Sequence, residues 1–288
     1  MSTTINSLAW WTWTVMRRIV QATDLRLRLY RSNLTPILVY QMGKVGSMSI
    51  AKSLVKNIKN PVFHVHALLR NAEDIKTRPV FDFSPRQEQI MKLQKLLGRE
   101  KGLFIYENII AKNQPVKVIT LTREPIGRNL AAFFQNFEME TGKTPKYSNF
   151  TSEELGDMFV KYYPHFVPLQ WFDKNVNKCL GIDVYDYDFP REKGFLTIQK
   201  KSLELLILKV ELPNQIKEKV IGEFLGLPEF RIVNNNLGED KDYSDIYKNL
   251  KQALKLPYSY VEEMCNSRYF RHFYTKEEIE QVFSRWTK

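Results

Sequence analysis

A short apolar strand followed by a loop of small residues is the feature that most constrains the fold of this chain. Residues 37–40 are apolar, and residues 43–49 contain two glycines, one lysine and two serines. A helical pattern follows, with Ile50, Leu54 and Ile58 on one face. A strand, a small-residue loop and a helix start together aim backbone N–H groups and the helix dipole at an anion. The alternative is a tight turn with a solvated lysine, and this segment alone leaves both interpretations open.

The loop differs from the Walker A loop of nucleoside triphosphatases. In that motif a serine or threonine directly follows the lysine, and its hydroxyl helps to hold Mg²⁺. Here Val45 follows Lys44, and the two serines of the loop are Ser47 and Ser49. The sequence therefore predicts a cradle for a phosphate-like group that lacks the usual metal ligand.

Composition narrows the classes of partner. The chain of 288 residues allows one large domain or two small ones, and its net charge of +11 and pI of about 9.4 favour anionic partners. The basic residues are scattered, and no zinc-finger or RNA-binding signature is present, so we expect no nucleic-acid partner. Two distant cysteines, Cys179 and Cys265, exclude a disulfide-rich scaffold and a cysteine-based zinc site.

Residues 1–35 are predicted to form a separate N-terminal helical extension, with the helix from about Ser7 to Tyr30. Three tryptophans precede five arginines in this segment, a pattern that suits peripheral contact with a membrane surface. The favoured alternative is that the tryptophans cover apolar surface of the same protein. Residues 8–16 have arginines after them rather than before, which is the wrong order for a secretory signal. No apolar run reaches the roughly 18 residues of a membrane span, so we expect a cytoplasmic protein, with membrane association left open.

Alternating strand and helix patterns predict a largely parallel sheet. The candidate strands are residues 37–41, 62–66, 116–122 and 203–210, with 195–199 as a partner of the last. The candidate helices are residues 84–97, 125–140, one capped by residues 151–154, and a polar helical region from about 240 that ends in 275–286. Residues 100–113 are ambiguous between helix and strand. The predicted fold is a three-layer, P-loop-like α/β domain of residues 36–288, with a central mainly parallel sheet flanked by helices.

A second candidate anion site follows the predicted strand 116–122. Arg123-Glu124-Pro125 comes directly after this strand, and Asn129 lies about one helical turn further on. Because the carboxyl ends of parallel strands share one edge, we expect Arg123 near the Lys44 loop, where it can bind a second phosphate through two N–H groups. The alternative is an ion pair between Arg123 and Glu124 at the helix start.

These two segments resemble the sulfotransferases that use 3′-phosphoadenosine-5′-phosphosulfate (PAPS). Residues 44–49, Lys-Val-Gly-Ser-Met-Ser, match the 5′-phosphosulfate loop of that family, and Arg123-Glu124-Pro125 matches the opening of its 3′-phosphate element. The family has a serine where this chain has Ala131, so that contact is absent or is taken over by Asn129 or Arg128. Residues 206–212 and 224–228 are similar to the family's late strand and following helix, and the resemblance runs over about residues 35–230.

Three further segments are similar to a bacterial branch named for capsular polysaccharide synthesis. They are residues 123–137, 181–185 and 271–274. This similarity implies a carbohydrate acceptor.

The resemblance implies transfer of a sulfuryl group from PAPS to a hydroxyl, without a metal. Lys44 would neutralise the bridging oxygen, and Arg123 with Asn129 would hold the 3′-phosphate. The 5′-phosphate would be held by the loop residues Gly43, Val45, Gly46, Ser47, Met48 and Ser49.

A general base is expected to take the proton of the acceptor hydroxyl. His64 and His66 alternate onto one face near the end of a predicted strand, and His66 is preferred because it is closer to the carboxyl edge. Glu107 is a reserve candidate, and a purely structural role for the histidines is the alternative. Two other functions stay open: a P-loop kinase or triphosphatase, and a non-catalytic protein that binds nucleotides or polyanions.

Overall fold

The computed structural model describes residues 32–69, 101–141, 150–233 and 254–287, together with residues 23, 27, 29, 30 and 251. The predicted helix of residues 84–97 and most of the predicted N-terminal extension lie outside these ranges. Among the described helices, none is long and apolar enough to cross a membrane.

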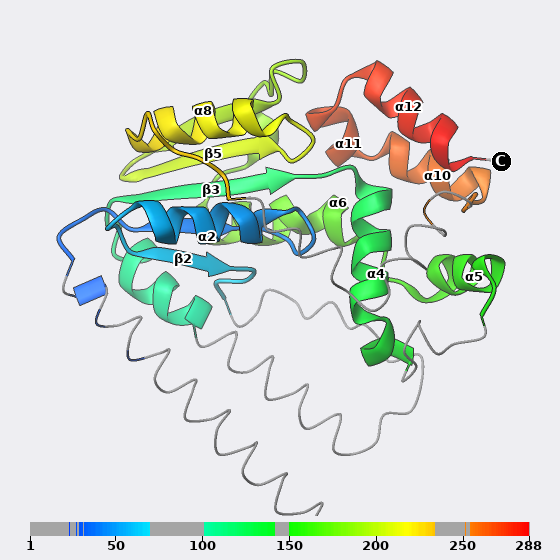
Figure 1. The fold of residues 1–288 in the computed structure, drawn as a ribbon, viewed down its shortest axis with the longest axis horizontal. Coiled ribbons are helices and arrows are strands. Elements are labelled where there is room, and N and C mark those ends of the chain that lie inside the picture. The colour runs from blue at the N-terminus through cyan, green and yellow to red at the C-terminus, as the bar shows by residue number, and fades with distance from the viewer. Residues whose placement is uncertain are drawn as a thin grey trace, which may run out of the picture.

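A sheet of five strands forms the centre of the described structure (Figure 1). The strands are β1 (Ile37–Tyr40), β2 (Val62–Val65), β3 (Val116–Thr122), β4 (Phe195–Lys200) and β5 (Leu203–Lys209). Their order is β2-β1-β3-β5-β4, and β4 is antiparallel to β5 while the other pairs are parallel. All five predicted strands are confirmed, each within one residue of its predicted ends.

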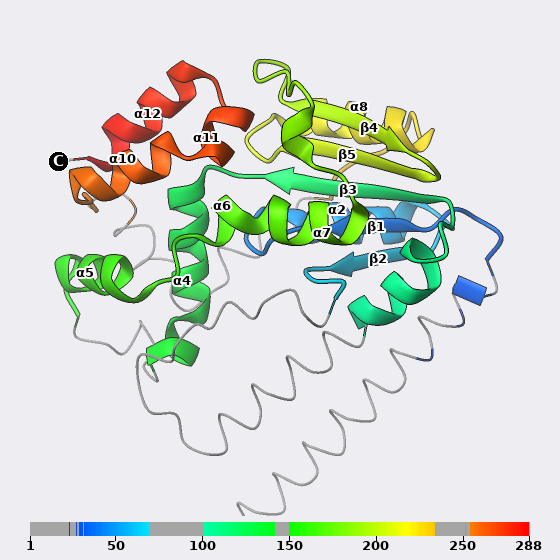
Figure 2. The same ribbon diagram turned by 180° about the vertical axis from the view of Figure 1, so that it is seen from behind.

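Helices cover both faces of the sheet, as predicted for this α/β fold. One face carries α2 (Ser47–Asn57) and α8 (Asn214–Leu225) (Figure 1). The other carries α6 (Val167–Trp171), the π-helical η3 (Phe172–Asn177) and α7 (Lys178–Leu180), which the reverse view shows in front of the strands (Figure 2). All residues of β1 and nearly all of β3 and β5 are buried, which is typical of strands covered on two faces.

Within the ambiguous region 100–113, residues 101–110 are helical and include the π-helical η1 (Tyr106–Ile110). It leads into β3, which lies on the opposite side of β1 from β2. The chain places β2 on one side of β1 and then crosses to place β3 on the other side. The order of strands therefore switches direction between β1 and β3. In open α/β sheets such a switch point, at the carboxyl ends of the strands, is where ligands bind.

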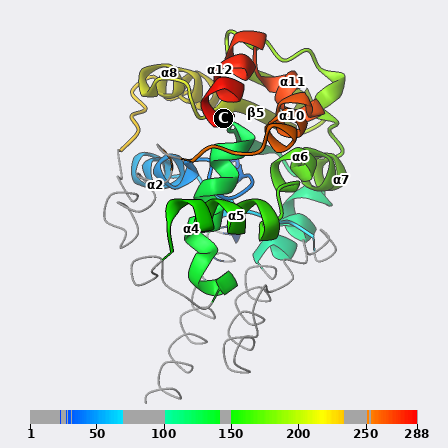
Figure 3. The ribbon, with the colours of Figure 1, turned by 90° about the vertical axis from the view of Figure 1, so that its right-hand side faces the viewer.

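Beyond the carboxyl ends of the strands lie α4 (Pro125–Thr141), α5 (Ser152–Tyr162) and three C-terminal helices (Figures 1 and 3). The latter are α10 (Tyr258–Asn266), α11 (Arg268–Phe273) and α12 (Lys276–Trp286). The predicted cap of α5 is confirmed, since Thr151 and Glu154 form a reciprocal capping box.

The C-terminal region is helical, as predicted, over much of residues 254–287, and its polar sequence also contains buried aromatic side chains. Tyr269, Phe270, Phe273 and Trp286 are completely buried there. Tyr269 and Phe270 are adjacent, and Arg271 and His272 separate them from Phe273. The helices α10 and α11 therefore contribute several side chains to the core, and α12 adds Trp286.

Candidate functional site

The loop between β1 and α2 lies at the switch point of the sheet. Lys44 and Gly46 both have left-handed backbones, with φ of 70° and 74°. A Cβ on Gly46 would lie 3.0 Å from Val210 Cγ2, so the conformation and the close approach both favour glycine. Gly46 precedes α2, whose first turn has no side-chain cap and no acidic residue. The N–H groups of this turn are therefore suited to an anion.

Two arginines bind consecutive carbonyl groups of the loop. Arg128 Nε donates to Gly43 O at 3.0 Å, and Arg123 Nη1 donates to Lys44 O at 2.7 Å. The second contact confirms the predicted proximity of Arg123 to the Lys44 loop. Because the C=O and N–H of a trans peptide point in opposite directions, the N–H groups of Lys44 and Val45 are directed away from these arginines. The carbonyl oxygens, which would repel an anion, are thus occupied within the protein.

Arg128 and Asn129 form a buried network behind the loop. Arg128 is 5% exposed, and its Nη1 donates to Asn129 Oδ1 at 2.9 Å and to the Tyr163 hydroxyl at 3.1 Å. Asn129 is 0% exposed, and its Nδ2 donates to His165 O at 2.8 Å. Both ends of the Asn129 amide are therefore bound inside the protein. The expected contact of Asn129 with a phosphate does not fit this geometry, because the side chain is buried and bound on both sides.

The network continues to α10 through His165. Its Nε2 lies 2.9 Å from Phe159 O and acts as donor, so its Nδ1 accepts the hydrogen bond from the Tyr260 hydroxyl at 2.7 Å. Burial lowers the pKa of His165 to about 4, which keeps the ring neutral at pH 7. These contacts give His165 a structural role.

His66 follows β2 and has an exposed side chain. Its Nδ1 donates to Gln41 O at 2.8 Å, so Nε2 of the neutral ring carries the lone pair. Desolvation by surrounding atoms lowers the pKa of His66; the bond to Gln41 raises it, and the positive charges of Arg128 and Lys101 lower it further. A neutral imidazole in a fixed tautomer is what a general base requires.

His64 instead anchors the start of α2. Its Nε2 lies 3.0 Å from Ser47 Oγ and 3.2 Å from Gln41 Nε2, and burial lowers its pKa to about 4. The Ser47 hydroxyl is thus bound to His64 and is almost completely buried. The expectation that this hydroxyl holds a phosphate does not fit, which leaves the backbone N–H of Ser47 for that role. Met48 and Ser49 continue the first turn and are at least partly exposed.

Glu107 is not brought into the site. The described part of its helix starts at Lys101, whose Nζ donates to His64 O at 3.0 Å near the carboxyl end of β2. The helix then runs toward Asn113, whose carbonyl binds Ser202 just before the start of β5. Glu107 is therefore displaced toward the amino ends of the strands.

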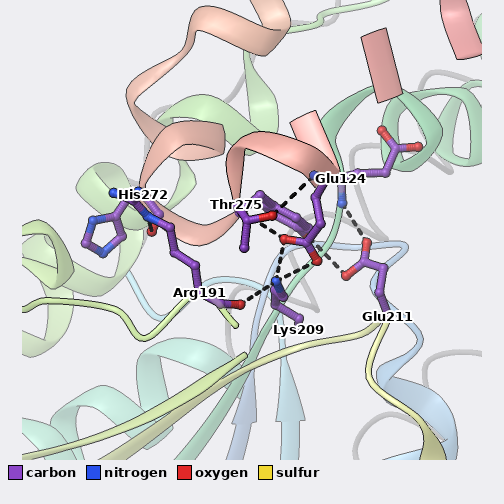
Figure 4. Close-up of polar contacts among 8 residues, drawn as sticks. Glu124, Arg191, Lys209, Glu211, His272 and Thr275 are labelled. Atoms are coloured by element: carbon purple, nitrogen blue, oxygen red, sulfur yellow. Dashed lines mark hydrogen bonds and ion pairs between the residues drawn. The ribbon is translucent and has the colours of Figure 1, made fainter. Parts of the chain in front are cut away.

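Glu124 caps α4. Its Oε1 accepts from the N–H of Gly127 at 2.7 Å. Its own N–H donates to Glu211 Oε1 at 2.9 Å (Figure 4). The Tyr274 hydroxyl binds the other oxygen of Glu211 at 3.0 Å. Burial, the largest cause, raises the pKa of both carboxyl groups. The sequence offered an ion pair between Arg123 and Glu124 as an alternative. In the structure the Glu124 carboxylate instead caps α4.

Metal ligands do not gather in the described part of the chain. No group of three or more histidine, cysteine, aspartate or glutamate side chains suited to a metal ion occurs within it. β3 ends in Thr122 rather than in a carboxylate.

Sequence reasoning missed three residues that hold the site together: Arg128 as a loop anchor, Tyr260 and Tyr269. The tyrosines lie far away in the sequence, and no local pattern marks them. The hydroxyl of Tyr269 binds the backbone of Arg123 across 146 positions.

Comparison with known proteins gave one family. Residues 148–275 match the model of a family described as "Putative capsular polysaccharide synthesis protein". No curated protein and no solved structure matched the chain. The matched segment runs from the start of α5 through α11 and includes Tyr163, His165 and Tyr269, but neither the Lys44 loop nor Arg123. Over residues 148–275, the chain is therefore similar to this capsular polysaccharide synthesis family.

Proposed function

We propose that this protein is a PAPS-dependent sulfotransferase that acts on a carbohydrate hydroxyl in capsular polysaccharide synthesis. The contact between Arg123 Nη1 and Lys44 O carries the proposal. This hydrogen bond joins the Lys44 loop to Arg123. The two elements follow the ends of the neighbouring parallel strands β1 and β3. A donor with two separate phosphate groups fits such a pair.

The start of α2 holds the 5′-phosphate in this proposal. The backbone N–H groups of Ser47, Met48 and Ser49 belong to an uncapped first turn, and the helix dipole adds positive potential there. Arg123 uses one N–H for Lys44 O, and its other guanidinium N–H groups bind the 3′-phosphate.

Lys44 and His66 carry the chemistry in this proposal. The acceptor oxygen forms a bond to sulfur while the bond from sulfur to the 5′-phosphate oxygen breaks, and 3′,5′-ADP leaves. Lys44 stabilises the negative charge that develops on that leaving oxygen. His66 Nε2 takes the proton of the acceptor hydroxyl, because its Nδ1–H is held by Gln41 O.

The acceptor class rests on the family similarity. The family description names capsular polysaccharide synthesis, and residues 148–275 contribute side chains to the network behind the loop. A sugar hydroxyl as acceptor is consistent with both.

Thermal-shift titration tests the donor. We expect 3′,5′-ADP to raise the melting temperature without Mg²⁺, and ATP to have a smaller effect. Stabilisation by ATP only, and only with Mg²⁺, would instead support a P-loop kinase or triphosphatase and overturn the proposal.

Transfer of labelled sulfate from PAPS to a panel of capsular glycans tests catalysis. Lys44→Ala and His66→Ala are expected to abolish transfer. Lys52→Ala removes the same charge from an exposed position on α2 and should leave transfer unchanged. Nucleotide binding without transfer to any glycan would indicate a non-catalytic binding protein.

A further inference from the structure

We propose that Tyr269 on α11 is a positioning residue that fixes Arg123 for recognition of the 3′-phosphate, an inference that rests on the proposed function. The Tyr269 hydroxyl accepts a hydrogen bond from Arg123 N–H at 3.0 Å and donates one to Arg123 O at 2.9 Å. One side chain thus holds both backbone groups of the arginine.

Arg123 needs such a partner because the sheet ends at this point. β3 pairs with β5 up to Thr122 opposite Lys209, and Val210 N–H then binds Thr122 O. On the other side, β1 pairs with β3 only up to Ile119. The backbone of Arg123 lies beyond both neighbours, and Tyr269 supplies the hydrogen bonds that a strand would otherwise give.

The position of the hydroxyl is set by the core. The Tyr269 ring is 0% exposed, stacks on Phe172 with centroids 6.1 Å apart, and meets Phe273 edge-on at 5.3 Å. The α11 helix is capped by Ser267 and is followed directly by α12. Rigid packing of this kind is what positions a binding group to within a fraction of an ångström.

Arg123 is consequently fixed at two points. Tyr269 holds its backbone, and Lys44 O holds one nitrogen of its guanidinium group. The C-terminal helices therefore contribute to donor recognition without contacting the donor.

The dissociation constants of 3′,5′-ADP and 5′-AMP, measured by calorimetry, test this role, because 5′-AMP lacks the 3′-phosphate. Tyr269→Phe keeps the ring and removes both hydrogen bonds. We expect it to weaken 3′,5′-ADP binding about tenfold and to leave 5′-AMP binding nearly unchanged. Tyr185→Phe is the matched control, because the Tyr185 hydroxyl is buried and has no hydrogen-bond partner within the described residues; it should change neither constant.

A double-mutant cycle sharpens the test. In an Arg123→Ala background, Tyr269→Phe should have no further effect on 3′,5′-ADP binding. If Tyr269→Phe does not fold, amide exchange in the wild type gives a separate readout: 3′,5′-ADP should slow exchange at the Arg123 N–H more than 5′-AMP does. Equal slowing by the two nucleotides would overturn the inference.

The outcomes separate this inference from the proposed function. Failure of the wild type to bind 3′,5′-ADP would remove the proposed function and the inference together. Normal 3′,5′-ADP binding by Tyr269→Phe would overturn the inference alone. An equal loss for both nucleotides would also overturn it, because it would show a general structural role.

Discussion

A buried ion pair fastens the C-terminal helices to the sheet, and its removal gives the sharpest stability prediction. Lys209, the last residue of β5, donates to both carboxylate oxygens of Glu278 at 2.7 Å and to Arg191 O at 2.8 Å (Figure 4). Glu278 lies in the first turn of α12 and forms a capping box with Thr275. We consider the substitution Glu278→Gln, which keeps the shape and a capping group but removes the charge.

The environment of the pair sets the expected magnitude. The Lys209 side chain is only 4% exposed, so its ammonium group would stay buried without a counter-charge; the Glu278 side chain is 35% exposed. Removing one partner of a fully buried pair costs about 3–5 kcal/mol. The partial exposure of Glu278 and the remaining amide oxygen reduce this, so we expect a loss of about 2–3 kcal/mol.

Denaturant unfolding at pH 7 measures the loss, and α12 provides its own control. Glu280 pairs with Lys276 at 3.7 Å on the exposed face, where the side chains are 64% and 85% exposed. Glu280→Gln should therefore cost less than about 0.5 kcal/mol. In addition, Lys209→Met combined with Glu278→Gln should recover part of the loss, because no buried charge is then left unpaired. The reasoning is refuted if the two glutamine variants have equal stability.

Three further predictions concern the loop and the histidines. Gly46→Ala should lower stability by about 1–2 kcal/mol and abolish stabilisation by 3′,5′-ADP, since φ is 74° and a Cβ would meet a neighbour at 3.0 Å. Gly226→Ala has a φ of 71° with no atom within 4 Å of the new Cβ, so it should lower stability but leave nucleotide binding intact. Arg128→Lys should cost about 1.5–3 kcal/mol in denaturant unfolding, because lysine cannot reproduce its three hydrogen bonds; unchanged stability would contradict this. Because the pKa values of His64 and His165 are about 4 in the fold, against about 6.5 when unfolded, the unfolded chain binds more protons between these values. The two histidines should therefore lower stability as the pH falls from about 6.5 to 4, while Glu124 and Glu211, whose pKa values are raised in the fold, act in the opposite direction. NMR titration measures each histidine directly, and a His64 or His165 ring that becomes protonated near pH 6.5 would disprove the assignment.

The sheet was predictable because its strands carry their signal locally. Each is a short run of mostly apolar residues between turn signals, and burial on two faces keeps those runs continuous. The proximity of Arg123 to Lys44 followed from the same pattern, since parallel strands place their carboxyl ends at one edge.

The contacts behind the loop were not predictable, because they depend on distant partners. Whether Arg128 and Asn129 point into the core or toward a ligand is decided by Tyr163 and His165, more than 30 positions away. Tyr269 lies in a short helix of interspersed aromatic and basic residues, and nothing in the local sequence marks its hydroxyl as a partner of Arg123.

The left-handed backbone of Lys44 has a consequence for how this loop can evolve. A side chain with a Cβ costs about 1–2 kcal/mol in this conformation, and glycine would avoid that strain. Stability and function therefore favour different residues at this position. Lys44→Gly should leave the fold at least as stable, but it removes the ammonium group from the loop. Sequences free of selection for anion binding are expected to drift toward glycine here. A lysine kept at position 44 would consequently indicate that selection favours activity over stability.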